Sequence, residues 1–141
     1  MTTLVIVLAC GVTAVLADTD PIAERRALMK HDGEAAKKLF DMSKGKIPFD
    51  LATVKESLAT LNEGATKSAA LFPDNSKTGG GTAALPAIWQ NKADFDEKSK
   101  KLEEESAKLV AANDEAAVKA QFGNVGKACG GCHETYRSKE K

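Results

Sequence analysis

The sequence is poor in aromatic residues, proline and cysteine, and it has no excess of charge of either sign. Phe, Trp and Tyr make up 5% of the 141 residues, with Pro 4 and Cys 3. The formal net charge is +0, with 20 basic and 20 acidic residues, so electrostatics give no reason to expect a nucleic-acid partner. Proline and aromatic residues are few while Ala, Lys, Glu and Leu are abundant, which predicts an all-α domain.

The first seventeen residues, MTTLVIVLACGVTAVLA, carry no charge and are nearly all apolar. They are too few for a comfortable membrane span, and they end in a small residue of the kind that a signal peptidase reads. We therefore predict a cleaved secretory signal over 1–17 and a periplasmic mature domain over 18–141 with no membrane span. No basic residue precedes the apolar run, which a start site placed slightly late would explain. A buried N-terminal helix is the alternative. Cleavage removes Cys10 and leaves Cys129 and Cys132.

Four stretches of the mature chain have the apolar spacing of amphipathic helices, with steps of three, four or seven residues. We expect them over about 21–44, about 50–71, from about 86 to beyond 109, and from about 114 onward. Together they predict an antiparallel four-helix bundle. The inward positions are Ile22, Met29, Ala36, Leu39 and Phe40; Leu51, Val54, Leu58, Leu61, Ala65 and Phe72; Ile88, Phe95, Leu102 and Leu109; and Val118, Phe122, Val125, Cys129, Cys132 and Tyr136.

The strongest chemical signal is the motif CGGCH near the end of the chain. On a helix, His133 lies about 40° to one side of Cys129 and Cys132 about 60° to the other, so all three project over one narrow arc. Two thiols beside an imidazole suit covalent attachment of haem c, in which each thiol adds to a vinyl group and the imidazole binds iron. We predict one haem c attached in this way.

Three other interpretations of the two cysteines fit the sequence less well. An exported protein with two cysteines usually forms a disulfide, but the adjacent histidine argues against that here. A redox C-x-x-C pair is expected near a βαβ pattern, and none is visible. A structural zinc ion needs a fourth ligand, and the other mature histidine, His31, has no cysteine nearby.

With these residues in place, the mature chain resembles the class II cytochromes c, the cytochrome c prime group. The resemblance is carried by CGGCHETYR, with Tyr136 and Arg137 after the histidine, by KGKIPFD between the first two helices and by LPAIW at the start of the third. It implies that Cys129 and Cys132 carry thioether bonds, that His133 is the proximal iron ligand, and that the first helix covers the distal face of the haem.

The resemblance also directs attention to Met29, four residues after Arg25 in ERRALMK. Five-coordinate members of the family carry a bulky apolar side chain at this place and bind nitric oxide or carbon monoxide. A thioether is instead a soft iron ligand that raises the reduction potential, so we predict His133/Met29 ligation. Ordinary core packing of Met29 is the alternative. By helical geometry His31 faces solvent and Met42 packs peripherally.

Arg25 resembles the family arginine that binds a haem propionate, and Arg26 is its alternative. Iron ligation by both His133 and Met29 predicts a one-electron carrier and not an enzyme. Gas binding is the alternative function, and a haem-free exported bundle is a third. An acidic redox partner is expected at the basic residues around the motif, and the resemblance makes a homodimer possible. Those basic residues are Lys127, Arg137, Lys139 and Lys141.

Overall fold

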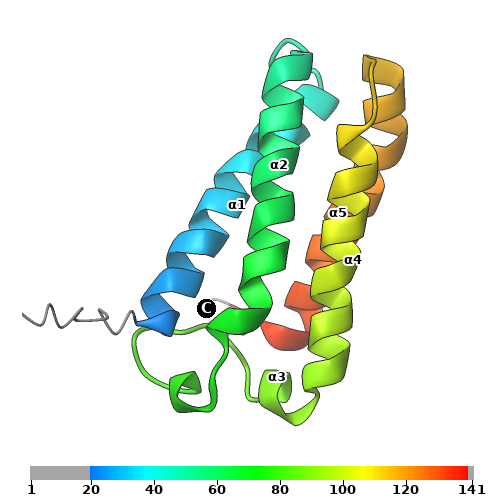
Figure 1. The fold of residues 1–141 in the computed structure, drawn as a ribbon. Coiled ribbons are helices and arrows are strands. Elements are labelled where there is room, and N and C mark those ends of the chain that lie inside the picture. Colours follow the sequence, from blue (N-terminus) through cyan, green and yellow to red (C-terminus); the bar gives the residue numbers. More distant parts are fainter. Residues whose placement is uncertain (1–19, 140–141) are drawn as a thin grey trace, which may run out of the picture.

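The computed structural model describes residues 20–139, which form a bundle of antiparallel helices (Figure 1). The long helices are α1 (Pro21–Ser43), α2 (Leu51–Ser68), α4 (Lys92–Val110) and α5 (Glu115–Tyr136). The short helix α3 (Ala87–Gln90) precedes α4, and two 3-10 turns, η1 (Ala69–Leu71) and η2 (Asp74–Ser76), follow α2. The prediction of an all-α four-helix bundle is confirmed. The predicted signal over 1–17 lies outside the described residues.

Aspartates begin three of the long helices. The side chains of Asp20, Asp50 and Asp114 each accept a backbone N–H two or three residues further on, at 2.8 or 2.9 Å. A carboxylate in this position satisfies an N–H that has no partner within the helix and interacts favourably with the helix dipole. Pro21 follows Asp20 in the first turn, where its missing N–H costs nothing. Local sequence signals therefore set where α1, α2 and α5 begin.

The predicted third helix is not continuous. It is divided into α3 and α4 at Asn91, whose φ of −136° and ψ of 58° lie outside the helical region. The indole N–H of Trp89 donates to the carbonyl oxygen of Phe72 at 3.0 Å, which ties α3 to the preceding loop. The seven-residue period hides this break, because Ile88 and Phe95 on its two sides belong to the same apolar cluster. The predicted second helix also ends earlier, with its last turn in 3-10 form.

Two apolar clusters fill the bundle. The larger cluster consists of Ala35, Leu39, Met42, Val54, Leu58, Leu61, Leu109, Ala112, Val118 and Val125. The smaller one consists of Ile88, Phe95 and Tyr136. Two sequence predictions were wrong here: Met42 is buried and Phe40 is 45% exposed. The buried stripe at the end of α1 follows Ala35, Leu39 and Met42, and Phe40 lies about 100° away from Leu39.

The helices do not pack equally against one another. In the bundle α1 packs on α2, α2 on α4 and α4 on α5, whereas α1 and α5 make only sparse contacts. On α5, Val125 belongs to the larger cluster and Tyr136 to the smaller, with the CGGCH motif between them. The motif therefore lies at the junction of the two apolar clusters. Within residues 20–139 no helix is long and apolar enough to cross a membrane.

Candidate cofactor site

The last turns of α5 present Cys129, Cys132 and His133, and all three side chains are half-buried. Both cysteines are free thiols. The end of α5 is held by an antiparallel bridge to the segment before α3, in which Leu85 N–H donates to the carbonyl oxygen of Tyr136 at 2.9 Å and Ser138 N–H to that of Ala83 at 2.8 Å. The C-terminus of α5, which carries the three residues, is therefore held in place by the segment before α3.

Burial determines the protonation states of the three side chains. It raises the pKa of the Cys129 thiol, an effect that the charge of Asp32 increases, and it raises the pKa of the Cys132 thiol. Burial also lowers the pKa of His133, and the neighbouring Arg137 lowers it further. The site therefore holds two neutral thiols and a neutral imidazole near neutral pH. The neutral imidazole is the form that binds a metal ion.

Tyr136 fastens the motif to α4. Its hydroxyl donates a hydrogen bond to Asp94, and its ring packs edge-on against Phe95 at 5.4 Å between centroids. Asp94 also forms an ion pair with Lys98 at 3.1 Å. The bond to Tyr136, followed by the one to Lys98, lowers the pKa of Asp94, whereas Asp94 raises the pKa of Tyr136 to about 12. At neutral pH the pair is a phenol and a carboxylate.

Arg25 lies on α1 and is 4% exposed. Its Nη1 donates to the carbonyl oxygen of Leu71 at 3.1 Å and to the hydroxyl of Ser76 at 2.9 Å, while its Nη2 donates to the carbonyl oxygen of Ser76 at 2.8 Å and to the hydroxyl of Thr82 at 2.6 Å. Burial lowers its pKa, and Asp20 opposes that shift. Arg25 thus holds together the loop that crosses the end of the bundle beside the start of α1 (Figure 1).

The inward side of α1 is polar at the level of the motif. Between the apolar residues Ile22 and Ala35, the buried positions are Arg25 and Asp32. Met29 lies between these two and is 41% exposed, although its spacing predicts an inward position. Apolar packing therefore leaves the thioether accessible. His31 is exposed, as predicted.

Asp32 is the residue of this region that sequence reasoning missed. It is 7% exposed, and its two carboxylate oxygens find no hydrogen-bond partner among the described residues. Burial raises its pKa to about 6, with His31 opposing and Glu63 adding to the shift. The sequence signal that could have identified Asp32 is its position three residues after Met29, which places a carboxylate in the inward stripe of α1. Periodicity counts only apolar residues, so it passed over this position.

The donor set fits a haem c. Two neutral thiols and a neutral imidazole on one face of α5 are the groups that thioether formation and iron binding require. Among the described residues no cluster of three or more His, Cys, Asp and Glu side chains has the arrangement of a metal site.

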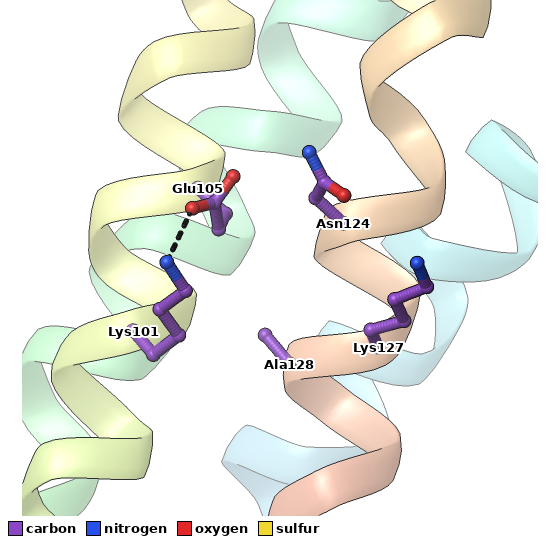
Figure 2. A pocket seen from close by; sticks show the side chains of 5 residues that line it. All are labelled: Lys101, Glu105, Asn124, Lys127 and Ala128. Carbon is purple, nitrogen blue, oxygen red and sulfur yellow. Dashed lines mark ion pairs between the residues drawn. The ribbon is translucent and has the colours of Figure 1, made fainter.

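A surface pocket of about 340 Å³ lies between α4 and α5 (Figure 2). It is lined by Lys101, Glu105, Asn124, Lys127 and Ala128. Within it Lys101 Nζ forms an ion pair with Glu105 at 2.7 Å. Lys127 and Asn124 lie about 160° and 140° around α5 from Cys129, so this polar pocket is distinct from the face that carries the thiols.

Comparisons with known proteins agree with this description. The family model described as Cytochrome C' matches residues 20–137. The chain is 46% identical over 129 residues to a cytochrome c' of Rhodopseudomonas palustris, covering 89% of this chain and 86% of that protein. It is 40% identical over 122 residues to a cytochrome c-556 of Agrobacterium tumefaciens, covering 84% and 98%. The solved structure of a Rhodopseudomonas palustris cytochrome c' superposes with a TM-score of 0.84 at 45% identity, covering 88% and 100%.

Proposed function

Because the chain belongs to the cytochrome c' family, whose members bind covalently attached haem c, we propose that it is a one-electron carrier with His133 and Met29 as axial iron ligands. In this proposal Cys129 and Cys132 form the two thioether bonds. The observation that carries the proposal is the exposure of Met29, a soft thioether ligand on the α1 face that lies between the buried Arg25 and Asp32.

The chain's own residues supply binding and orientation. The bound haem supplies a one-electron couple at iron. His133 offers a neutral nitrogen because burial and Arg137 disfavour its cationic form. Tyr136 fixes the end of α5 through its bond to Asp94. Two protein ligands that stay bound in both oxidation states leave no open iron position for a substrate, which suits electron transfer without chemistry on a bound molecule.

Spectroscopy of the matured protein tests this proposal. Visible absorption of the oxidised and reduced protein and electron paramagnetic resonance of the oxidised protein are expected to be low-spin, and Met29→Leu is expected to make them high-spin because leucine has no sulfur ligand. Met42→Leu is the matched control, because Met42 is buried in the larger cluster and the exchange conserves volume. High-spin spectra of the unaltered protein would contradict the proposed ligation.

Gas binding is the second candidate function. One observation favours it: a relative that is 46% identical bears the name cytochrome c'. If Met29 does not bind iron, the distal position is free for nitric oxide or carbon monoxide. Carbon monoxide added to the reduced protein distinguishes the two functions, since rapid and stoichiometric binding supports the gas-binding one.

We also propose that residues 1–17 are removed as a secretory signal, which places the domain 18–141 in the periplasm. The mass of the exported protein tests the cleavage position. Of the basic residues expected to guide an acidic redox partner, exposed Arg137 and Lys139 follow the motif directly, Lys127 lies on the opposite side of α5, and Lys141 lies outside the described residues. Electron-transfer rates that do not change with ionic strength would contradict that guidance.

A further inference from the structure

Asp32 is held in a position that is costly for a carboxylate. Its two oxygens are the buried side-chain atoms left without a hydrogen-bond partner within residues 20–139. Removing a charged carboxylate from water without a partner costs several kcal/mol, so such a group binds a proton or faces a positive charge. The structure must therefore compensate this charge through something other than the chain's own hydrogen bonds.

The surroundings of Asp32 place it beside the attachment motif. From α2, Gly64 lies so close that a Cβ added there would be 2.3 Å from Oδ2 of Asp32. From α5, Cys129 is near enough for the charge of Asp32 to raise the pKa of its thiol. Asp32 thus lies close against α2, and its charge acts on a cysteine of α5 to which the haem would be attached.

The other charged groups that face Asp32 do not neutralise it. His31, its neighbour on α1, is exposed, and Glu63 of α2 has the same sign as Asp32. Glu63 itself forms an exposed ion pair with Lys67. Cys129 no longer titrates once it is a thioether. Asp32 is therefore the group in this region whose protonation state would respond to the charge of a neighbouring haem.

We propose that Asp32 takes up one proton when the haem iron is reduced and releases it on oxidation, so that this chain transfers its electron together with a proton. The inference rests on the proposed function, since it needs a haem on α5 whose iron changes oxidation state. On reduction, a donor protein gives one electron to ferric iron and solvent gives one proton to the carboxylate, forming one O–H bond. Oxidation reverses both transfers, and the net charge of iron and carboxyl together is unchanged.

The direction follows from electrostatics. Ferric haem carries one more positive charge than ferrous haem, and a nearby positive charge stabilises the carboxylate over the carboxylic acid. Reduction removes that charge, so the proton binds more tightly to the reduced protein. By linkage, the reduction potential must then fall as pH rises through the range in which Asp32 titrates. The raised pKa of about 6 places that range close to neutrality.

Spectroelectrochemical titration of the haem-loaded protein between pH 5 and 8 tests the inference, with Asp32→Asn and the control Glu34→Gln. Glu34 is an exposed acid on the same helix. For the unaltered protein and the control, we expect the reduced-to-oxidised ratio at fixed potential to change by about tenfold for each pH unit in which Asp32 titrates, about 59 mV per unit. Asp32→Asn is expected to remove that change and to hold the potential near the low-pH value of the unaltered protein.

Infrared difference spectra between the oxidised and reduced protein give a second measurement. A protonated-carboxyl band that appears on reduction and is missing in Asp32→Asn is expected. Equal pH dependence in the unaltered protein and in Asp32→Asn would overturn the inference and leave the electron-carrier proposal intact. High-spin spectra together with a pH dependence that Asp32→Asn removes would overturn the Met29 ligation and leave the role of Asp32 standing.

Discussion

Arg25 donates two hydrogen bonds to Ser76, from Nη1 to its hydroxyl at 2.9 Å and from Nη2 to its carbonyl oxygen at 2.8 Å. The two nitrogens also bond Leu71 and Thr82, so the guanidinium closes a loop that lies about fifty residues away in the sequence. The face of Phe72 lies under the same guanidinium at 4.8 Å. A bidentate bond from Arg25 to a haem propionate, as the resemblance implies, would have to share these Nη donors with the loop.

Arg25→Lys is expected to lower the free energy of unfolding by about 2–4 kcal/mol, because one ammonium cannot replace two nitrogens that bond four acceptors. Denaturant unfolding of the haem-loaded protein measures the loss. Arg26→Lys is the matched control, since Arg26 makes one exposed bond to the carbonyl oxygen of Gly80 at 2.8 Å, and its loss is expected to stay within about 0.5 kcal/mol. Equal losses would contradict the role given to Arg25.

Gly64→Ala is expected to destabilise the protein by about 1–3 kcal/mol, because the new Cβ would collide with the carboxylate of Asp32. Gly33→Ala is the control in α1: a Cβ there meets no atom within 4 Å, so alanine is expected to stabilise the helix by up to about 1 kcal/mol. A double-mutant cycle with Asp32→Ala checks the cause. If Gly64→Ala costs as much when position 32 is alanine, the collision with Asp32 is not the reason.

The helices could be predicted from the sequence because their signals are local. Three aspartates at helix starts and the three-and-four spacing of apolar residues act within one or two turns. The common face of Cys129, Cys132 and His133 also follows from helix geometry alone. The roles of Arg25 and Asp32 depend instead on Ser76 and Gly64, which the fold brings to them from other segments.

Local patterning also misplaced some residues. The period of seven joined α3 to α4 because the chain resumes the same face after it leaves helical geometry at Asn91. The angle between Met42 and Met29 on an ideal helix predicts a peripheral position for Met42. The buried stripe instead shifts along α1, and Met42 packs into the larger cluster. This shift depends on how α1 packs against α2, so the sequence of α1 alone does not predict it.

The stability of the reduced protein is expected to fall as pH rises from about 4 to above 6. The folded state raises the pKa of Asp32 to about 6 from 3.8, so it binds this proton more tightly than the unfolded chain. The resulting stabilisation, about 3 kcal/mol in total, is present in full below the unfolded-state pKa of Asp32. It is lost as the pH rises through the folded-state pKa. Unfolding of Asp32→Asn measured over the same range is expected to lack this fall. An identical fall in the variant would assign it to another group.

Tyr136→Phe is expected to cost about 1–2 kcal/mol of unfolding free energy, because it deletes the hydroxyl that donates to Asp94 while keeping the ring against Phe95. The loss of that donor also lets the pKa of Asp94 rise toward its ordinary value, which carboxyl chemical shifts can follow. In an Asp94→Asn background the cost is expected to shrink. An undiminished cost would mean that the hydroxyl acts through some other contact.

Replacing the cysteines singly tests the attachment residues directly. In a host that matures c-type cytochromes, Cys129→Ser and Cys132→Ser are each expected to leave one thioether, which shifts the pyridine haemochrome band toward that of a haem with one free vinyl group. The double variant is expected to carry no covalent haem on a denaturing gel. Cys10→Ser is the control, because the predicted signal carries that thiol away before attachment. Covalent haem in the double variant would rule out these two thiols, whereas its loss in Cys10→Ser would mean that residues 1–17 remain part of the mature protein.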